Sequence, residues 1–179
     1  MNLRDRFRSA LSFAEFLAAA TKNVELWRDL YRLSVVPAAA AARVHAFGVE
    51  RHLLILAEDW CGDAVNTVPV IVRLAEASGT LDVRLLGRDS NPELMDSHLT
   101  NGSRSIPLVM VLDEHFDEIA RWGPRPHELQ HWMLTTGLAM ETSPRYRYVR
   151  AWYARDHGET TVAEMLAILD AGPDRHAAA

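Results

Sequence analysis

The sequence predicts an α/β domain in which helices flank a mixed sheet, with additional helices at the N- and C-terminal ends. Short apolar or alternating segments typical of strands are separated by segments with apolar residues at helical spacing. The last two strand segments are close enough to form a hairpin, so antiparallel pairing is expected beside the parallel pairing of an α/β fold. With 179 residues, 49% of them hydrophobic, the chain can bury a core as one domain with additions.

Residues 1–48 are expected to form an N-terminal helical extension. Ser12 and Glu15 form a capping box at the start of one helix, a second helix is expected over residues 24–33, and the alanine-rich stretch 38–42 favours a third. We interpret the extension as a layer that covers the sheet. A lid that shapes the substrate site or binds a partner is the alternative.

A change of periodicity marks Cys61, the only cysteine. The apolar run 53–56 predicts a buried strand, and apolar residues from Val65 onward recur at helical spacing. Cys61 is therefore expected at a helix N-terminus, where unpaired N–H groups and the helix dipole favour a thiolate.

The carboxylates next to Cys61 are expected to raise its pKa, whereas the helix terminus is expected to lower it. Glu58, Asp59 and Asp63 each disfavour a thiolate whereas the helix dipole favours it, so these opposing effects leave the sign of the pKa shift open. The helix terminus leads us to expect a pKa for Cys61 at or below the value of about 8.5 for a free cysteine.

The remaining elements follow in the order strand, helix, strand, strand, helix. A strand is expected over 81–86, a helix from Pro92 through Leu99, an apolar strand over 106–112 and a hairpin strand over 116–122. Two prolines then begin the closing helix, at positions Pro124 and Pro126.

Residues 141–172 are expected to add two helices, before a disordered tail at 173–179. Ser143 is the predicted N-cap of the first, and Thr161 the N-cap of the second. The first helix carries a stripe of large apolar residues, which we interpret as core or dimer packing, a ligand surface being the alternative. The stripe consists of Tyr146, Tyr148, Val149, Trp152 and Tyr153.

Several segments resemble landmarks of the thioredoxin family. Trp60-Cys61-Gly62-Asp63-Ala64 resembles the Trp-Cys-Gly-Pro-Cys active site, and Pro69 stands where thioredoxins bend the helix that follows. Arg104-Ser105-Ile106-Pro107 resembles the loop with the cis-proline, and Trp122-Gly123 the end of the last hairpin strand. The resemblance implies a thioredoxin-like domain over 49–140.

The resemblance also implies site residues. Cys61 would be the catalytic nucleophile, within an active-site motif formed by Trp60, Gly62, Asp63 and Ala64. Ile106 and Pro107 would offer backbone to an extended substrate, and Arg104 would lie near the thiol. Ile55 and Leu85 replace the aspartate and lysine that thioredoxins commonly bury beneath the cysteine pair.

Ala64 stands where a dithiol thioredoxin has its resolving cysteine. A mixed disulfide at Cys61 must therefore be resolved by an outside thiol. We expect a monothiol thiol-disulfide oxidoreductase whose partners are protein or low-molecular-weight thiols and disulfides. A non-catalytic binding module that uses the groove beside Pro107 is the main alternative, and a sensor in which Cys61 becomes a sulfenic acid is a lesser one.

His127-Glu128-Leu129-Gln130-His131 matches the H-E-x-x-H pattern of zinc proteases. The buried face of this helix, marked by Leu129, is expected opposite both histidines, so we predict a solvent-exposed pair and no metal site.

Charge and composition exclude other classes. The net charge of −5 gives no general attraction to nucleic acid or anionic lipid, and no uncharged run approaches the length of a membrane span. A single cysteine agrees with a reducing compartment, so a cytoplasmic protein without a cofactor is expected, with a homodimer possible.

Overall fold

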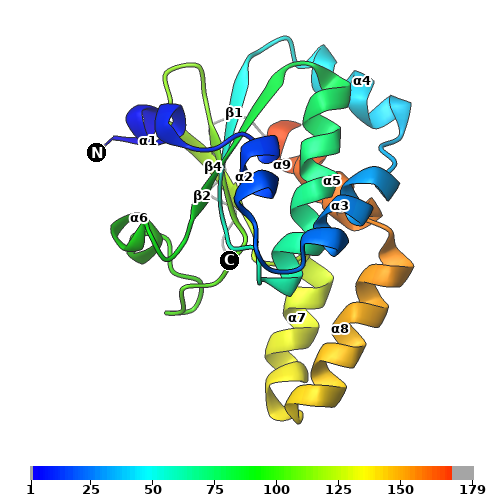
Figure 1. The fold of residues 1–179 in the computed structure, drawn as a ribbon. Helices are drawn as coiled ribbons and strands as arrows, with labels where there is room; N and C mark the ends of the chain where they lie inside the picture. The colour runs from blue at the N-terminus through cyan, green and yellow to red at the C-terminus, as the bar shows by residue number, and fades with distance from the viewer. Residues whose placement is uncertain (1, 171–179) are drawn as a thin grey trace.

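The computed structural model describes residues 2–170, in which helices surround a four-stranded mixed sheet (Figure 1). The strand order is β2-β1-β3-β4. The strands are β1 (Arg51–Ala57), β2 (Leu81–Gly87), β3 (Leu108–Leu112) and β4 (Glu118–Trp122). β1 pairs parallel with β2 and antiparallel with β3, and β3 pairs antiparallel with β4. The predicted fold class is therefore confirmed; the predicted tail, 173–179, lies outside the described residues.

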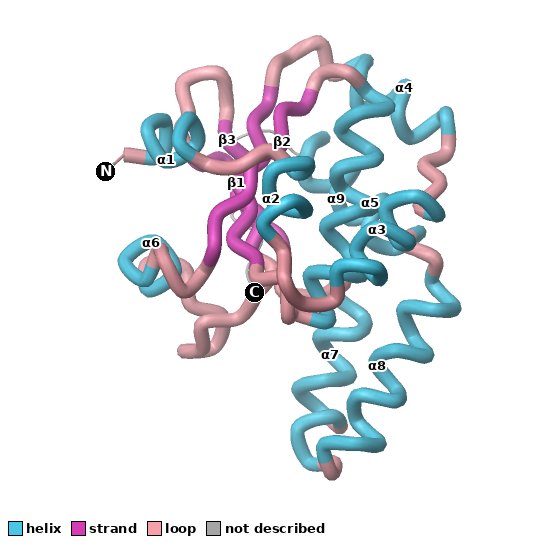
Figure 2. The backbone as a smooth tube through the Cα atoms, viewed as in Figure 1, coloured by secondary structure: helices cyan, strands magenta, loops and turns pink. Residues whose placement is uncertain are grey.

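Helices cover both faces of the sheet, which is why β1 is apolar on both sides (Figures 1 and 2). The helices are α1 (Leu3–Ser9), α2 (Phe13–Ala19), α3 (Val24–Leu33), α4 (Ala38–Ala46), α5 (Gly62–Ser78), α6 (Pro92–Asp96), α7 (His127–Thr135), α8 (Thr142–Asp156) and α9 (Glu159–Asp170). A short 3₁₀ helix, Gly137–Ala139, lies between α7 and α8. α5 packs against α3, α4 and α9, while α1 and α6 lie on the opposite side of the strands.

α7 and α8 form a hairpin that projects from the body of the molecule (Figure 1). The rings of Trp132 and Tyr148 stack with their centroids 3.8 Å apart, and Leu129, Val149 and Trp152 belong to the small core between the two helices. Much of the aromatic stripe of α8 therefore packs within the chain. α9, the second helix of the C-terminal extension, packs against α5 and β4.

Several element boundaries differ from the sequence-based prediction. β3 begins at Leu108 rather than at residue 106, and β4 begins at Glu118 rather than at residue 116. α6 ends at Asp96 rather than reaching Leu99, because the carbonyl of Leu94 accepts hydrogen bonds from the side chains of Ser97 and His98. α8 begins at Thr142, with Glu141 rather than Ser143 at the N-cap.

The predicted N-cap at Thr161 is wrong. His157 and Gly158 both have left-handed backbone conformations, so the chain turns within two residues and α9 already begins at Glu159. Thr161 is the third residue of α9, within its first turn, where its hydroxyl is buried and caps nothing. No helix within residues 2–170 is both long and apolar enough to cross a membrane.

Candidate active site

Cys61 is the N-cap residue of α5, in the turn that joins the central strand β1 to that helix. Its Sγ accepts a hydrogen bond from the Ala64 N–H at 3.5 Å, and the thiol donates to the Ile106 carbonyl oxygen at 3.4 Å. The residue is 7% exposed. The thiol is thus held between the start of a helix and the loop before β3.

Burial raises the pKa of Cys61 above its ordinary value. The N–H groups of Ala64 and Asp63 and the positive charge of Arg125 lower this pKa, and the carboxylate of Asp63 raises it. The net effect is a raised pKa for Cys61, so the expectation of a pKa at or below that of a free cysteine is wrong. The cost of desolvating a thiolate in this buried position exceeds the stabilisation from the helix terminus.

Two of the three neighbouring carboxylates bond elsewhere. Asp59 accepts backbone N–H bonds from Thr21 at 2.6 Å and Lys22 at 2.8 Å; burial raises its pKa, but these bonds outweigh burial and the pKa is lowered. Glu58 accepts a hydrogen bond from the Asp89 N–H at 2.8 Å. Asp63 is therefore the neighbouring carboxylate that acts on Cys61.

Asp63 is buried between two residues from the C-terminal half of the chain. Its Oδ2 lies 2.6 Å from Nη2 of Arg125, and its Oδ1 accepts a 3.0 Å hydrogen bond from the Tyr153 hydroxyl. Burial raises the pKa of Asp63, while the contacts with Arg125 and Tyr153 lower it. Burial also raises the pKa of Tyr153, whose hydroxyl therefore stays protonated and donates.

The loop that contains Ile106 and Pro107 packs closely against the backbone of Gly123. The Ile106-Pro107 peptide bond is cis, as the resemblance implied. Gly123 has a φ of +116°, and a Cβ on it would lie 2.1 Å from the Pro107 carbonyl oxygen. Only glycine permits this approach, so Gly123 fixes the loop that carries Arg125 against the loop that carries Ile106.

The other predicted site residues lie around the thiol. Trp60 is 47% exposed, with the Arg88 guanidinium 4.9 Å above its ring. Ala64 is fully buried, whereas a Cβ on Gly62 would meet no atom within 4 Å. Arg104 makes a bidentate pair with Asp96, at 2.6 and 2.7 Å, so it lies at the site without contacting the thiol directly.

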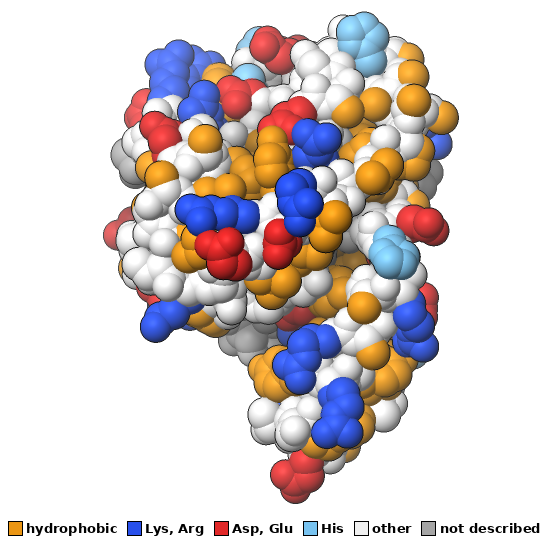
Figure 3. Space-filling view, turned by 45° about the vertical axis from the view of Figure 1, so that its right-hand side comes forward, with side chains coloured by type: hydrophobic (Ala, Val, Ile, Leu, Met, Phe, Trp, Pro, Cys, Tyr) orange, Lys and Arg blue, Asp and Glu red, His pale blue; other side chains and the backbone are white. Residues whose placement is uncertain are grey.

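Trp60, Cys61, Gly62 and Arg104 are among the residues that line a groove of about 490 Å³. Its walls come from α3, the start of α5, the loop before β3 and α8, and its lining side chains include Asn23, Leu26, Trp60, Cys61, Asp63, Asn66, Arg88, Arg104, Ile106, Arg125, Tyr146, Val149 and Arg150. In the space-filling view, Lys and Arg side chains (blue) occur on both the body and the projecting hairpin, among hydrophobic ones (orange) (Figure 3). Both terminal extensions therefore contribute to the groove.

Sequence reasoning missed three arginines of the groove, Arg88, Arg125 and Arg150, and it missed Tyr153, which bonds to Asp63. Arg125 alone carried a local signal, because it stands between Pro124 and Pro126 in a segment that begins with Gly123. The others come from elements whose contact with the site depends on tertiary packing.

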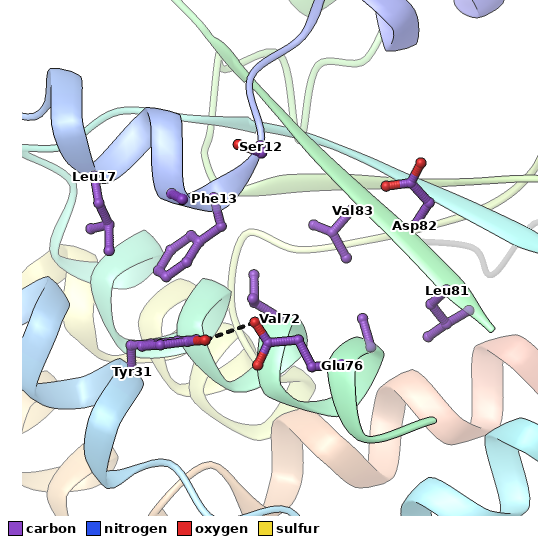
Figure 4. A pocket seen from close by; sticks show the side chains of 11 residues that line it. Ser12, Phe13, Leu17, Tyr31, Val72, Glu76, Leu81, Asp82 and Val83 are labelled. Carbon is purple, nitrogen blue, oxygen red and sulfur yellow. Dashed lines mark hydrogen bonds between the residues drawn. The ribbon is translucent and has the colours of Figure 1, made fainter. Parts of the chain in front are cut away.

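Two other candidate functional sites lack a reactive group comparable to the Cys61 thiol. A cavity of about 370 Å³ between α2, α3, α5 and β2 is mostly apolar, and its Tyr31 donates a 2.7 Å hydrogen bond to Glu76 (Figure 4). His127 and His131 are both exposed, on the side of α7 away from the buried Leu129. Their predicted exposure is confirmed.

Comparisons with known proteins agree with this fold. A structure of a protein of unknown function, PA1234 from Pseudomonas aeruginosa, superposes with a TM-score of 0.77 at 19% identity, covering 96% of this chain and 98% of that one. An HIV epitope scaffold superposes with a TM-score of 0.75, also at 19% identity, covering 96% and 99%. No curated protein sequence matches. The family model Thioredoxin_9, described as thioredoxin, matches residues 10–143, and the chain therefore belongs to this thioredoxin family.

Proposed function

We propose that the protein is a monothiol thiol-disulfide oxidoreductase that acts through a mixed disulfide at Cys61. One observation carries the proposal: the only thiol of a thioredoxin-family chain lines a groove, at the N-cap of α5 and against the cis-proline loop. The carbonyl oxygen of Ile106 lies 3.4 Å from the sulfur, in the loop whose backbone at Ile106 and Pro107 would pair with an extended substrate.

In the first step, Sγ of Cys61 attacks one sulfur of a disulfide. A new S–S bond forms to Cys61, the original S–S bond breaks, and the departing thiolate takes up the proton that Cys61 has lost. Because Ala64 offers no second thiol, an external thiolate must then attack the substrate-derived sulfur and release Cys61.

A non-catalytic binding module is the second candidate, and it has its own support. Burial raises the pKa of Cys61, and its thiol donates a hydrogen bond to Ile106, which stabilises the protonated form. A protonated thiol is a poor nucleophile. The same groove would then bind a partner without exchange.

The test measures mixed-disulfide formation at Cys61 from pH 6 to pH 10 by intact-mass spectrometry, with a free-cysteine peptide as reference. We expect an adduct whose rate rises with pH and continues to rise above the midpoint of the reference, because the pKa of Cys61 is raised and the thiolate is the reacting species.

Trapping in oxidant-treated cells gives the complementary result. Partners recovered through Cys61 and lost in Cys61→Ser support exchange. Recovery that is unchanged in Cys61→Ser, together with no adduct at any pH, would make the binding module the correct function.

A further inference from the structure

We infer that the groove beside Cys61 binds a low-molecular-weight thiol, or its disulfide, that carries carboxylate groups. This inference rests on the proposed exchange at Cys61 and names the class of molecule that supplies the missing resolving thiol. The observation that supports it is independent of that exchange: the groove that contains the sulfur of Cys61 is lined by four arginines from four different segments.

The size of the groove fits a small molecule. About 490 Å³ falls within the range of roughly 300–1,000 Å³ typical of small-ligand sites. The groove is concave and enclosed by α8 on one side and by the loop before β3 on another, with Tyr146 and Ile106 on these two walls. A molecule of a few residues can fill this space while its sulfur reaches Cys61.

The charge of the lining is opposite to that of the chain. The sequence carries a net charge of −5, yet Arg88, Arg104, Arg125 and Arg150 line the groove and Asp63 is its single lining carboxylate. The cluster stays positive when the carboxylates bonded to Arg88 and Arg104 are included, since four arginines then face three carboxylates. Convergent guanidinium groups recognise carboxylates with high geometric specificity.

The arginines differ in how readily they can accept a ligand. The Arg150 side chain is exposed and, within residues 2–170, makes no ion pair or hydrogen bond, so a ligand carboxylate would replace only water. The pair Arg104–Asp96 is half-exposed and screened by solvent, so Arg104 can exchange its partner for a ligand carboxylate. The Arg88 side chain is only 22% exposed and also donates a hydrogen bond to the Arg104 carbonyl, so it is held more firmly. Arg150 is therefore the residue to test.

The exchange balances with this class of thiol as the resolving reagent. Cys61 attacks a substrate disulfide and yields a mixed disulfide at Cys61 and one substrate thiol; the anionic thiol then attacks the substrate-derived sulfur, which regenerates Cys61 and forms a disulfide between the anionic thiol and the substrate. The groove would select the thiol by its carboxylates.

Binding is measured without exchange by titrating S-methylglutathione, an unreactive anionic thioether, into Cys61→Ser and following the amide NMR signals. We expect saturable binding that weakens at high salt and about tenfold on adding Arg150→Gln. Arg147→Gln is the matched control, because Arg147 is also an exposed arginine of α8 but does not line the groove. Absence of binding, or an equal effect of the two arginine changes, would overturn the inference.

Exchange is then measured in the wild type with glutathione disulfide (anionic), 2-hydroxyethyl disulfide (neutral) and cystamine (cationic), each relative to its rate with a free-cysteine peptide. The anionic disulfide should be favoured, and the preference should fall in Arg150→Gln but not in Arg147→Gln. Equal relative rates for the three would refute anion selection and leave the proposed exchange intact. No adduct with any disulfide would refute the exchange, and thioether binding would still decide whether the groove takes an anionic ligand.

Discussion

Asp63 is the residue at which this chain differs most informatively from the thioredoxin motif. Position 63 carries a buried carboxylate in place of the usual proline, and that carboxylate bonds to both Arg125 and Tyr153. Because Asp63 raises the pKa of Cys61 while Arg125 lowers it, the two charges form an opposed pair beside the thiol. The reactivity of Cys61 therefore depends on residues more than 60 positions away in sequence.

Removing either charge should shift the pKa of Cys61 in opposite directions. Asp63→Asn deletes the carboxylate and leaves Arg125 in place, so the pKa should fall; Arg125→Gln deletes the cation, so the pKa should rise. Each change leaves one charge of a mostly buried pair without its partner, which should lower the free energy of unfolding by about 3 kcal/mol. The pH dependence of iodoacetamide alkylation measures the first effect and urea unfolding the second; shifts of the same sign in both variants would contradict this account.

Some features of individual site residues follow from the nearby sequence, whereas others depend on tertiary packing. The N-cap position of Cys61 was predictable from the change of period around it, because strand and helix patterns are local. The sign of its pKa shift was not, because burial is the first cause and depends on packing against the Ile106 loop. The role of Asp59 could not be predicted either, because its carboxylate bonds to Thr21 and Lys22, which lie far from it in sequence, rather than acting on the thiol.

At the scale of elements, two loops meet behind the thiol. Gly123, which follows β4, lies against the carbonyl of Pro107, which precedes β3. β3 and β4 are paired neighbours, so their ends bring the two loops together, and the absent side chain at position 123 lets the backbones touch.

Gly123→Ala should therefore destabilise the fold by about 3 kcal/mol or more, because it adds a backbone clash to an unfavourable φ. Gly79→Ala is the control: Gly79 also has a positive φ, of +69°, but a Cβ there meets nothing within 4 Å. Its cost should be about 1–2 kcal/mol. Denaturant unfolding gives both values, and alkylation of Cys61 should change only in Gly123→Ala. Equal costs would show that the contact with Pro107 is unimportant.

Most elements could be predicted, and the errors have identifiable causes. The helices over 24–33 and from Ser12 follow amphipathic and capping patterns that act locally. The capping pattern at Thr161 also exists in the sequence, but a tight left-handed turn at His157 and Gly158 starts the helix earlier.

At the scale of the molecule, both terminal extensions reach the active site. α8 contributes Tyr153 and Arg150, and the segment before α3 contributes Asn23. The N-terminal extension was interpreted as a covering layer, with a substrate-shaping lid as the alternative; it packs Phe13, Phe16 and Trp27 into the main core and also lines the groove with Asn23 and Leu26.

Asp59 connects this extension to the active-site turn, so Asp59→Ala should loosen it. The change removes the acceptor for the N–H groups of Thr21 and Lys22, at a cost of about 1–2 kcal/mol, and the start of α3 should exchange amide hydrogens faster. Asp29→Ala is the control, because Asp29 lies on α3 in an exposed pair with Arg32. Hydrogen exchange by mass spectrometry over residues 21–33 distinguishes the two variants.

The same connection has a defined pH dependence. The pKa of Asp59 is lowered in the folded protein, so its contribution is present above the ordinary carboxyl pKa of 3.8 and is lost as the pH falls through the lower, folded value. The difference in unfolding free energy between wild type and Asp59→Ala should therefore stay constant from neutral pH to about pH 5 and shrink only in stronger acid. If the difference were already lost near neutral pH, or if Asp29→Ala loosened the segment equally, Asp59 would not be what anchors the N-terminal helices to the turn that carries Cys61.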